Sequence, residues 1–198
     1  MHSPFKCQIA VIVVLALLSP VPANAQGVTF RNAEFKFRFV YPSDWTQQTP
    51  RGPNVRALIQ GPPGRMSNCN IVVRRMPALD KLSRKEIIAD SFSTTWSESD
   101  WKEMLGDKFS NAIVRERRLT KASNYPVQFS IVETPYETVA ANVHVMMVQF
   151  VTMTPGIFWH FGCSAGGATS EQARQQFQQM RPQFLSILSS FVFEGDFY

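Results

Sequence analysis

One pentapeptide in the sequence has the residue types and spacing of a serine-hydrolase nucleophile. Residues 162–166, Gly-Cys-Ser-Ala-Gly, match the pattern G-x-S-x-G. In hydrolases with this motif the serine stands on a sharp turn between a strand and a helix, and a histidine activates it by accepting its proton. In that family the histidine comes later in the chain, but no histidine follows Ser164. The sequence therefore favours a protein without enzymatic activity, and an exported serine hydrolase that uses Ser164 is the alternative.

The remaining nucleophiles and ligand types form no convincing site. Cys163 follows His160 by three residues, and on a strand such side chains point to opposite faces, so they cannot form a direct thiol–imidazole pair. His144 and His160 could share a metal ion only if their strands paired at those positions, and no carboxylates accompany them. The sequence also lacks a Gly-rich phosphate loop. We therefore expect no catalytic residues, no metal and no cofactor.

The first residues predict export. Lys6 precedes an unbroken apolar run, residues 9–18, and residues 23–25 read Ala-Asn-Ala, which matches the A-x-A cleavage signal. The apolar run is shorter than the roughly 20 residues that a membrane-spanning helix needs. We therefore predict that residues 1–25 are a cleaved signal peptide. Residues 26–198 then form a single domain with no transmembrane segment after processing, in the periplasm or secreted.

Cys69 and Cys163 are the two cysteines that remain after this cleavage. An even number of cysteines in an oxidising compartment favours a disulfide. Each cysteine alternates with apolar residues along a strand-like segment, so each is expected on a buried strand face. A bond between them would stabilise the fold by about 4–5 kcal/mol in the chain-entropy model. The alternative is two buried thiols that never meet.

The charge of the chain gives little reason to expect a nucleic-acid partner. Without Lys6 the chain has 19 basic and 15 acidic side chains. The densest basic cluster, residues 115–118, contains its own acid, Glu116, and no basic stripe with interleaved aromatic residues is present. We therefore expect no nucleic-acid binding, and an unknown envelope protein or small ligand as the partner.

The chemistry-bearing residues lie on a predicted β-hairpin. Residues 142–153 and 157–163 are apolar runs separated by Thr-Pro-Gly, which is typical of an antiparallel hairpin. Both runs are apolar on both faces, so we expect helices to cover at least one side of the sheet. Further strands are predicted over residues 28–30, 35–41, 54–60, 68–76, 108–121, 126–133 and 190–193.

Capping boxes predict two helices, starting at Ser83 and Thr169. The first should carry an apolar stripe through Ile88, Phe92 and Trp96, and the second should be kinked or split at Pro182. Together these elements predict an α+β fold. Its antiparallel sheet has about six to eight strands and is sandwiched between helices.

Residues 37–45, Phe-Arg-Phe-Val-Tyr-Pro-Ser-Asp-Trp, resemble the start of PsbP-like and DcrB-like proteins, a superfamily that includes a Ran-binding nuclear-import factor. The order of predicted elements is also similar. The resemblance implies a PsbP-like α/β/α sandwich and a non-enzymatic binding or accessory role. No metal or partner residue of the family can be matched here. We therefore expect an exported binding or accessory protein of the cell envelope; weak membrane association through the aromatic tail, residues 193–198, is a further option.

Overall fold

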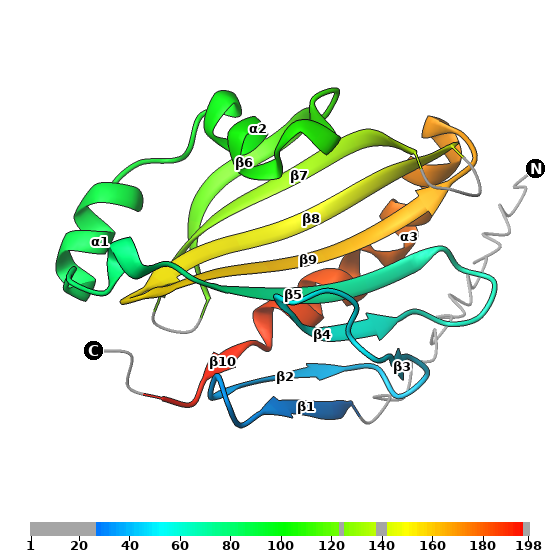
Figure 1. Ribbon diagram of the computed structural model, residues 1–198. Helices are drawn as coiled ribbons and strands as arrows, with labels where there is room; N and C mark the ends of the chain where they lie inside the picture. The colour runs from blue at the N-terminus through cyan, green and yellow to red at the C-terminus, as the bar shows by residue number, and fades with distance from the viewer. Residues whose placement is uncertain (1–26, 123–124, 138–141, 196–198) are drawn as a thin grey trace, which may run out of the picture.

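The computed structural model describes residues 27–122, 125–137 and 142–195, and a large antiparallel sheet dominates it (Figure 1). The predicted signal peptide lies outside the described residues, so its cleavage stays a prediction. The sheet has seven strands in the order β3-β4-β5-β9-β8-β7-β6. The bounds of its strands are Thr46–Gln47 (β3), Val55–Gln60 (β4), Ser67–Arg75 (β5), Ile113–Ala122 (β6), Tyr125–Glu137 (β7), Asn142–Thr154 (β8) and Ile157–Gly167 (β9). The predicted α+β class is confirmed.

The predicted hairpin is the centre of this sheet. β8 and β9 pair along their whole length, from Thr154↔Ile157 to His144↔Gly167. Gly156 in the turn has φ of +72°, a left-handed conformation that glycine adopts at little cost.

A second, smaller sheet was not foreseen as a separate element. It consists of β1 (Val28–Asn32), β2 (Phe37–Tyr41) and β10 (Val192–Phe193), in the order β1-β2-β10. Phe37 of β2 is fully buried and packs edge-to-face on Trp159 of β9, with ring centroids 5.9 Å apart. The small sheet therefore closes one end of the main core and does not extend the large sheet.

The described helices are α1 (Arg84–Ser91), α2 (Glu98–Leu105) and α3 (Ser170–Ser189), with 3-10 turns η1 (Pro77–Leu79) and η2 (Asp107–Phe109). The capping box at Ser83 is confirmed. The predicted stripe on the first helix is wrong, because α1 ends at Ser91 and Trp96 lies beyond it. A run of Ser and Thr follows α1, and their side chains compete with helical hydrogen bonds.

Helix α3 crosses one face of the large sheet, behind it in Figure 1. It runs unbroken through Pro182, where a break or kink was predicted. Pro182 is exposed, so solvent can reach the carbonyl group that the missing N–H leaves unpaired. The predicted apolar stripe of α3 is confirmed, since these residues are all buried: Ala173, Phe177, Met180, Phe184, Ile187 and Leu188.

The disulfide between Cys69 and Cys163 is present, with an S–S distance of 2.07 Å. The two residues face each other directly across β5 and β9, and both are buried under α3. The bond thus joins two central strands from parts of the chain that are 94 residues apart. Within the described ranges, none of the helices combines the length and the apolar character of a membrane span.

Candidate functional site

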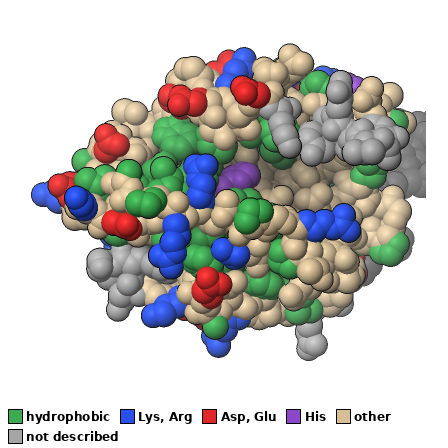
Figure 2. All heavy atoms as spheres, in the orientation of Figure 1, with side chains coloured by type: hydrophobic (Ala, Val, Ile, Leu, Met, Phe, Trp, Pro, Cys, Tyr) green, Lys and Arg blue, Asp and Glu red, His purple; other side chains and the backbone are tan. Residues whose placement is uncertain are grey.

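The opposite face of the large sheet contains a hollow of about 600 Å³. This face looks towards the viewer in Figure 2, and the hollow is visible in it. Helix α2 covers the face only in part: its buried Trp101 packs on Val151 of β8 and Phe158 of β9. Further along the same strands the sheet stays open. The hollow lies over this open part of β5, β9 and β8.

A fully buried glutamine binds the segment between α1 and α2, which covers the rest of this face of the sheet. The amide nitrogen of Gln128 on β7 donates to the carbonyl oxygens of Ser91, at 3.2 Å, and Thr94, at 2.7 Å. Its amide oxygen accepts from the backbone N–H of Trp96 at 3.0 Å. Every polar atom of this side chain is therefore paired, and the segment between α1 and α2 is tied to the sheet beside the hollow.

Small residues on β9 form the floor of the hollow. Side chains alternate along a strand, so Gly162, Ser164 and Gly166 face the hollow while Phe161 and Cys163 face α3. A Cβ atom at Gly162 would lie 3.5 Å from His160 Nε2, and one at Gly166 would lie 3.5 Å from Met66 Cβ. Both are ordinary contact distances, so the glycines open space that the rest of the fold does not fill.

The match to G-x-S-x-G arises because its two glycines and its serine are the small residues of this floor. Ser164 lies within β9, opposite Met147 on one side and Asn68 on the other, and α3 begins only at Ser170. It therefore does not stand on the turn between strand and helix that a nucleophile elbow requires. His160 is four residues away on the same strand, about 13 Å at the usual rise of a strand, which is too far for proton transfer.

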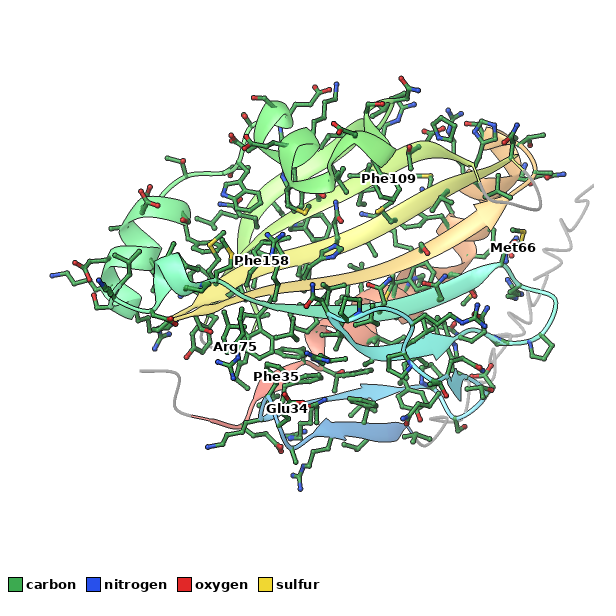
Figure 3. All side chains as sticks on the ribbon, viewed as in Figure 1. Glu34, Phe35, Met66, Arg75, Phe109 and Phe158 are labelled. Atoms are coloured by element: carbon green, nitrogen blue, oxygen red, sulfur yellow. A yellow bond between two sulfur atoms is a disulfide. The ribbon has the colours of Figure 1, made fainter. Side chains whose placement is uncertain are left out.

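The two walls of the hollow differ in chemistry. The wall on the β4–β5 side carries the amides of Gln60, Asn68 and Asn70, with the apolar side chain of Val72 beside them on β5. The wall on the other side is apolar, and comes from α2, η2 and β8: Leu105, Phe109, Val143, Val145 and Met147. Figure 3 shows Phe109 and Met66 on opposite sides of this region, and Met66 is 51% exposed at the rim. Among the residues that the structure describes, the lining contains no Asp, Glu, Lys or Arg.

His160 contributes a neutral imidazole to the site. Its Nε2 lies 2.9 Å from Oε1 of Gln149, whose amide nitrogen donates to Ser130 Oγ at 2.9 Å. Gln149 and Ser130 are fully buried. Burial of most of the imidazole ring lowers the pKa of His160 to about 4. The ring is therefore uncharged at neutral pH, with Nε2–H donating to Gln149.

The two histidines do not meet. His160 pairs with Val151, whereas His144 pairs with Gly167 at the far end of the hairpin. Val143 and Val145 face the hollow, so alternation turns His144 to the other face of the sheet. In the described part of the chain no three His, Cys, Asp or Glu side chains gather as a metal site would require.

Asn70 is a polar residue of the site that sequence reasoning missed. Its Oδ1 is buried and accepts no hydrogen bond from any residue that the structure describes. The same atom lies 3.8 Å from the Cβ position of Gly162, beside the floor. The alternation of Asn68, Asn70 and Val72 was visible in the sequence, but not that this face of β5 borders an open space.

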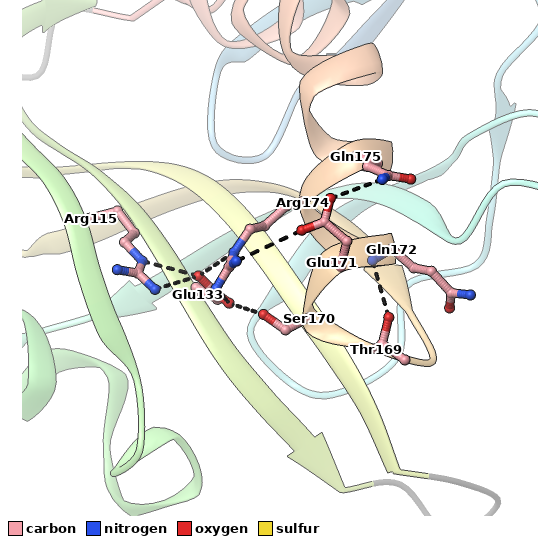
Figure 4. A network of polar contacts seen from close by, with 8 residues as sticks. All are labelled: Arg115, Glu133, Thr169, Ser170, Glu171, Gln172, Arg174 and Gln175. Atoms are coloured by element: carbon pink, nitrogen blue, oxygen red, sulfur yellow. Dashed lines mark hydrogen bonds and ion pairs between the residues drawn. The ribbon is translucent and has the colours of Figure 1, made fainter.

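A second polar cluster, on the α3 side of the sheet, was also missed (Figure 4). Glu133 of β7 is only 5% exposed. It accepts hydrogen bonds from Arg115 at 2.9 and 3.0 Å, from Arg174 at 2.9 and 3.1 Å, and from the hydroxyl of Ser170. Burial raises the pKa of Glu133, but the hydrogen bonds from Arg174, Ser170 and Arg115 outweigh it and lower the pKa to about 2. The cluster fastens the start of α3 to β6 and β7.

No protein-family model matches the sequence, and neither does any curated protein. Solved structures do match. The solution structure of cyanobacterial PsbP (CyanoP) from Synechocystis sp. PCC 6803 superposes with a TM-score of 0.55 and 16% identity, covering 90% of this chain and 98% of that one. The crystal structure of the Ran-binding protein Mog1p from Saccharomyces cerevisiae gives 0.51 and 9%, covering 85% and 96%. At these identities the matches show the fold alone: the chain has the PsbP-like/Mog1 fold, as the resemblance predicted.

Proposed function

We propose that this protein is an exported, non-enzymatic binding or accessory protein of the cell envelope that holds its ligand or partner in the hollow over β5, β9 and β8. The hollow is the observation that carries the proposal. Its volume of about 600 Å³ lies within the usual range of ligand pockets, and it combines an apolar wall with a few polar groups, as such pockets do. Glycines at 162 and 166 keep its floor open.

Two features support an exported protein. Residues 1–25 have the sequence of a cleavable signal peptide. The disulfide between Cys69 and Cys163 is the kind of bond that persists in oxidising compartments. Both point to the periplasm or the exterior of the cell as the place of action.

The fold relatives support binding as a role for this architecture. Mog1p is a Ran-binding protein, so the same fold serves protein recognition in at least one case. The hydrolase alternative has weaker support, because Ser164 lies within a strand and neither described histidine is placed to activate it. A fluorophosphonate probe that labelled the wild type but not Ser164→Ala would favour the hydrolase.

The test compares the protein purified from the envelope of its host with a variant whose hollow is filled. Gly162→Leu places an aliphatic side chain into the hollow from the floor. The control, Ala168→Leu, adds a side chain of the same size at an exposed position just after β9. We expect molecules that co-purify with the wild type, identified by native mass spectrometry, to be lost from Gly162→Leu and kept by Ala168→Leu. Equal capture by all three proteins, or a chain that stays unprocessed in the cytoplasm, would contradict the proposal.

A further inference from the structure

We infer that the hollow takes an uncharged amphipathic ligand, whose apolar part lies against β8 and η2 and whose hydrogen-bonding group faces Asn68 and Asn70 on β5. This inference rests on the proposed binding role and names the class of ligand. It follows from three properties of the lining: the absence of charged side chains among its described residues, the difference between its two walls, and the unpaired side-chain oxygen of Asn70.

None of the described lining residues carries a charged side chain that could neutralise a charged ligand. An ion that enters such a site loses its hydration without gaining a counter-charge, which is costly. His160 does not change this balance, because it is neutral at physiological pH and its Nε2–H is already bonded to Gln149. The site therefore discriminates against carboxylates and ammonium groups alike.

The arrangement of the strands separates the two walls. β9 lies between β5 and β8, so its glycine floor has the amides, together with Val72, on one side and only the apolar side chains of β8 on the other. A molecule that lies across β9 meets polar groups at one end and apolar surface at the other. Neither a uniformly polar nor a uniformly apolar molecule matches both walls.

The unpaired Oδ1 of Asn70 points to a donor on the ligand. Buried polar atoms in folded proteins nearly always have a hydrogen-bond partner, and leaving one unpaired is destabilising. Less than 1 Å² of this atom is exposed, so the Asn70 amide has to rotate before a neutral hydroxyl or amide group at this end of the hollow can supply the missing partner. A primary amide is the best probe, because it offers both donors and an acceptor and so complements Asn70 in either orientation of its side-chain amide.

Three probes test the inference: octanamide, octanoate and octylamine, which share an eight-carbon chain and differ in the charge of the head group. Binding to the processed, oxidised protein at pH 7 is followed by NMR through the methyl groups of Val143, Val145 and Met147. We expect octanamide to bind at least about tenfold more tightly than either charged probe. The same methyl resonances should shift on binding.

Variants locate the binding and invert its selectivity. Gly162→Leu, and independently Ser164→Leu in case the first does not fold, should abolish octanamide binding, whereas Ala168→Leu should keep it. Asn70→Asp places a carboxylate at the polar end, so it should weaken octanamide and raise the affinity for octylamine by about tenfold.

The inference is wrong if a charged probe binds the wild type as tightly as octanamide, if no probe binds, or if Gly162→Leu and Ser164→Leu both bind octanamide normally. These outcomes differ from failure of the proposed function. If Gly162→Leu loses its envelope ligand in the capture experiment but a charged probe binds best, the binding role stands and only the ligand class is wrong. If Gly162→Leu co-purifies with the same molecules as the wild type, the proposed function is wrong, whatever the three probes show.

Discussion

Replacing Glu133 with glutamine should destabilise the protein by an amount that depends on pH. Glutamine has the size of the protonated acid but carries no charge, so the variant removes the ionised state alone. A carboxyl group whose pKa falls from 4.5 to about 2 on folding stabilises the folded state by roughly 3 kcal/mol at pH 7. The side chains of Arg115 and Arg174 are 46% and 45% exposed, so water hydrates both guanidinium groups and offsets part of the free energy lost with the two ion pairs. We therefore expect Glu133→Gln to cost about 2–3 kcal/mol at pH 7.

The pH dependence follows from the direction of the pKa shift. Because the pKa of Glu133 is lower in the folded state, its stabilisation is complete above about pH 5 and disappears as the pH falls through about 2. About half of it should remain at pH 3. The difference between wild type and variant should shrink accordingly.

Urea unfolding of the oxidised protein at pH 7, 5 and 3, followed by tryptophan fluorescence, measures this difference. Glu171→Gln is the matched control: Glu171 is on the same helix, but its side chain is 66% exposed and 3.9 Å from Arg174, so its loss should cost less than about 1 kcal/mol. A Glu133→Gln variant as stable as the wild type at pH 7, or a difference of unchanged size at pH 3, would refute the reasoning.

Three further predictions concern the central strands. Reducing the bond between Cys69 and Cys163 should lower the free energy of unfolding by about 4–5 kcal/mol, measured as urea midpoints with and without reductant; an unchanged midpoint would contradict it. The pKa of His160 is lower in the folded state, so wild-type stability should fall by about 1–3 kcal/mol between roughly pH 6.5 and 4, and His160→Gln should flatten that part of the profile. Gly162→Ala should leave the melting temperature nearly unchanged, because its Cβ fits at 3.5 Å from the nearest atom. Gly167→Ala should lower the free energy of unfolding by about 1–3 kcal/mol, because its Cβ would lie 2.6 Å from the backbone nitrogen of Ala173 in α3. Equal melting temperatures for Gly162→Ala and Gly167→Ala would contradict this prediction.

Local patterns in the sequence predicted much of the fold. The Pro-Gly turn and its apolar arms gave the β8–β9 hairpin, since both turn chemistry and strand pattern are short-range properties. The capping box at Ser83 and the apolar stripe of α3 were predictable for the same reason. The pairing of Cys69 with Cys163 could be predicted because the expected signal-peptide cleavage would leave only these two cysteines.

The candidate site could not be predicted, because it depends on contacts between distant parts of the chain. The sequence shows that β9 alternates small and large residues, but not that α2 stops short of Gly162 and Gly166 and leaves them uncovered. The cluster at Glu133 brings together residues from β6, β7 and α3. The residues next to Glu133 in the sequence do not indicate that two arginines from other elements form ion pairs with it. The small sheet escaped prediction too, since β2 pairs with β10 from the far end of the chain.

If the proposed binding role is correct, the alternation along β9 assigns stability to one face of the strand and binding to the other. Trp159, Phe161 and Cys163 face the core, where they pack under the small sheet and α3 and carry the disulfide. Gly162 and Ser164 face the hollow and contribute almost no packing. A floor that contains glycines is flexible by itself, because glycine increases backbone freedom and makes no side-chain contacts.

Here the core side supplies the rigidity that the floor lacks, through the disulfide to β5 and the cluster at Glu133 that fastens α3 to the sheet. The strands that line the hollow are therefore held in place by the core, and the proposed binding would not have to order them. It follows that the two properties are separable by mutation. Substitutions at Phe161 should lower stability with little change in ligand selectivity, and substitutions at Gly162 should change binding with little change in stability.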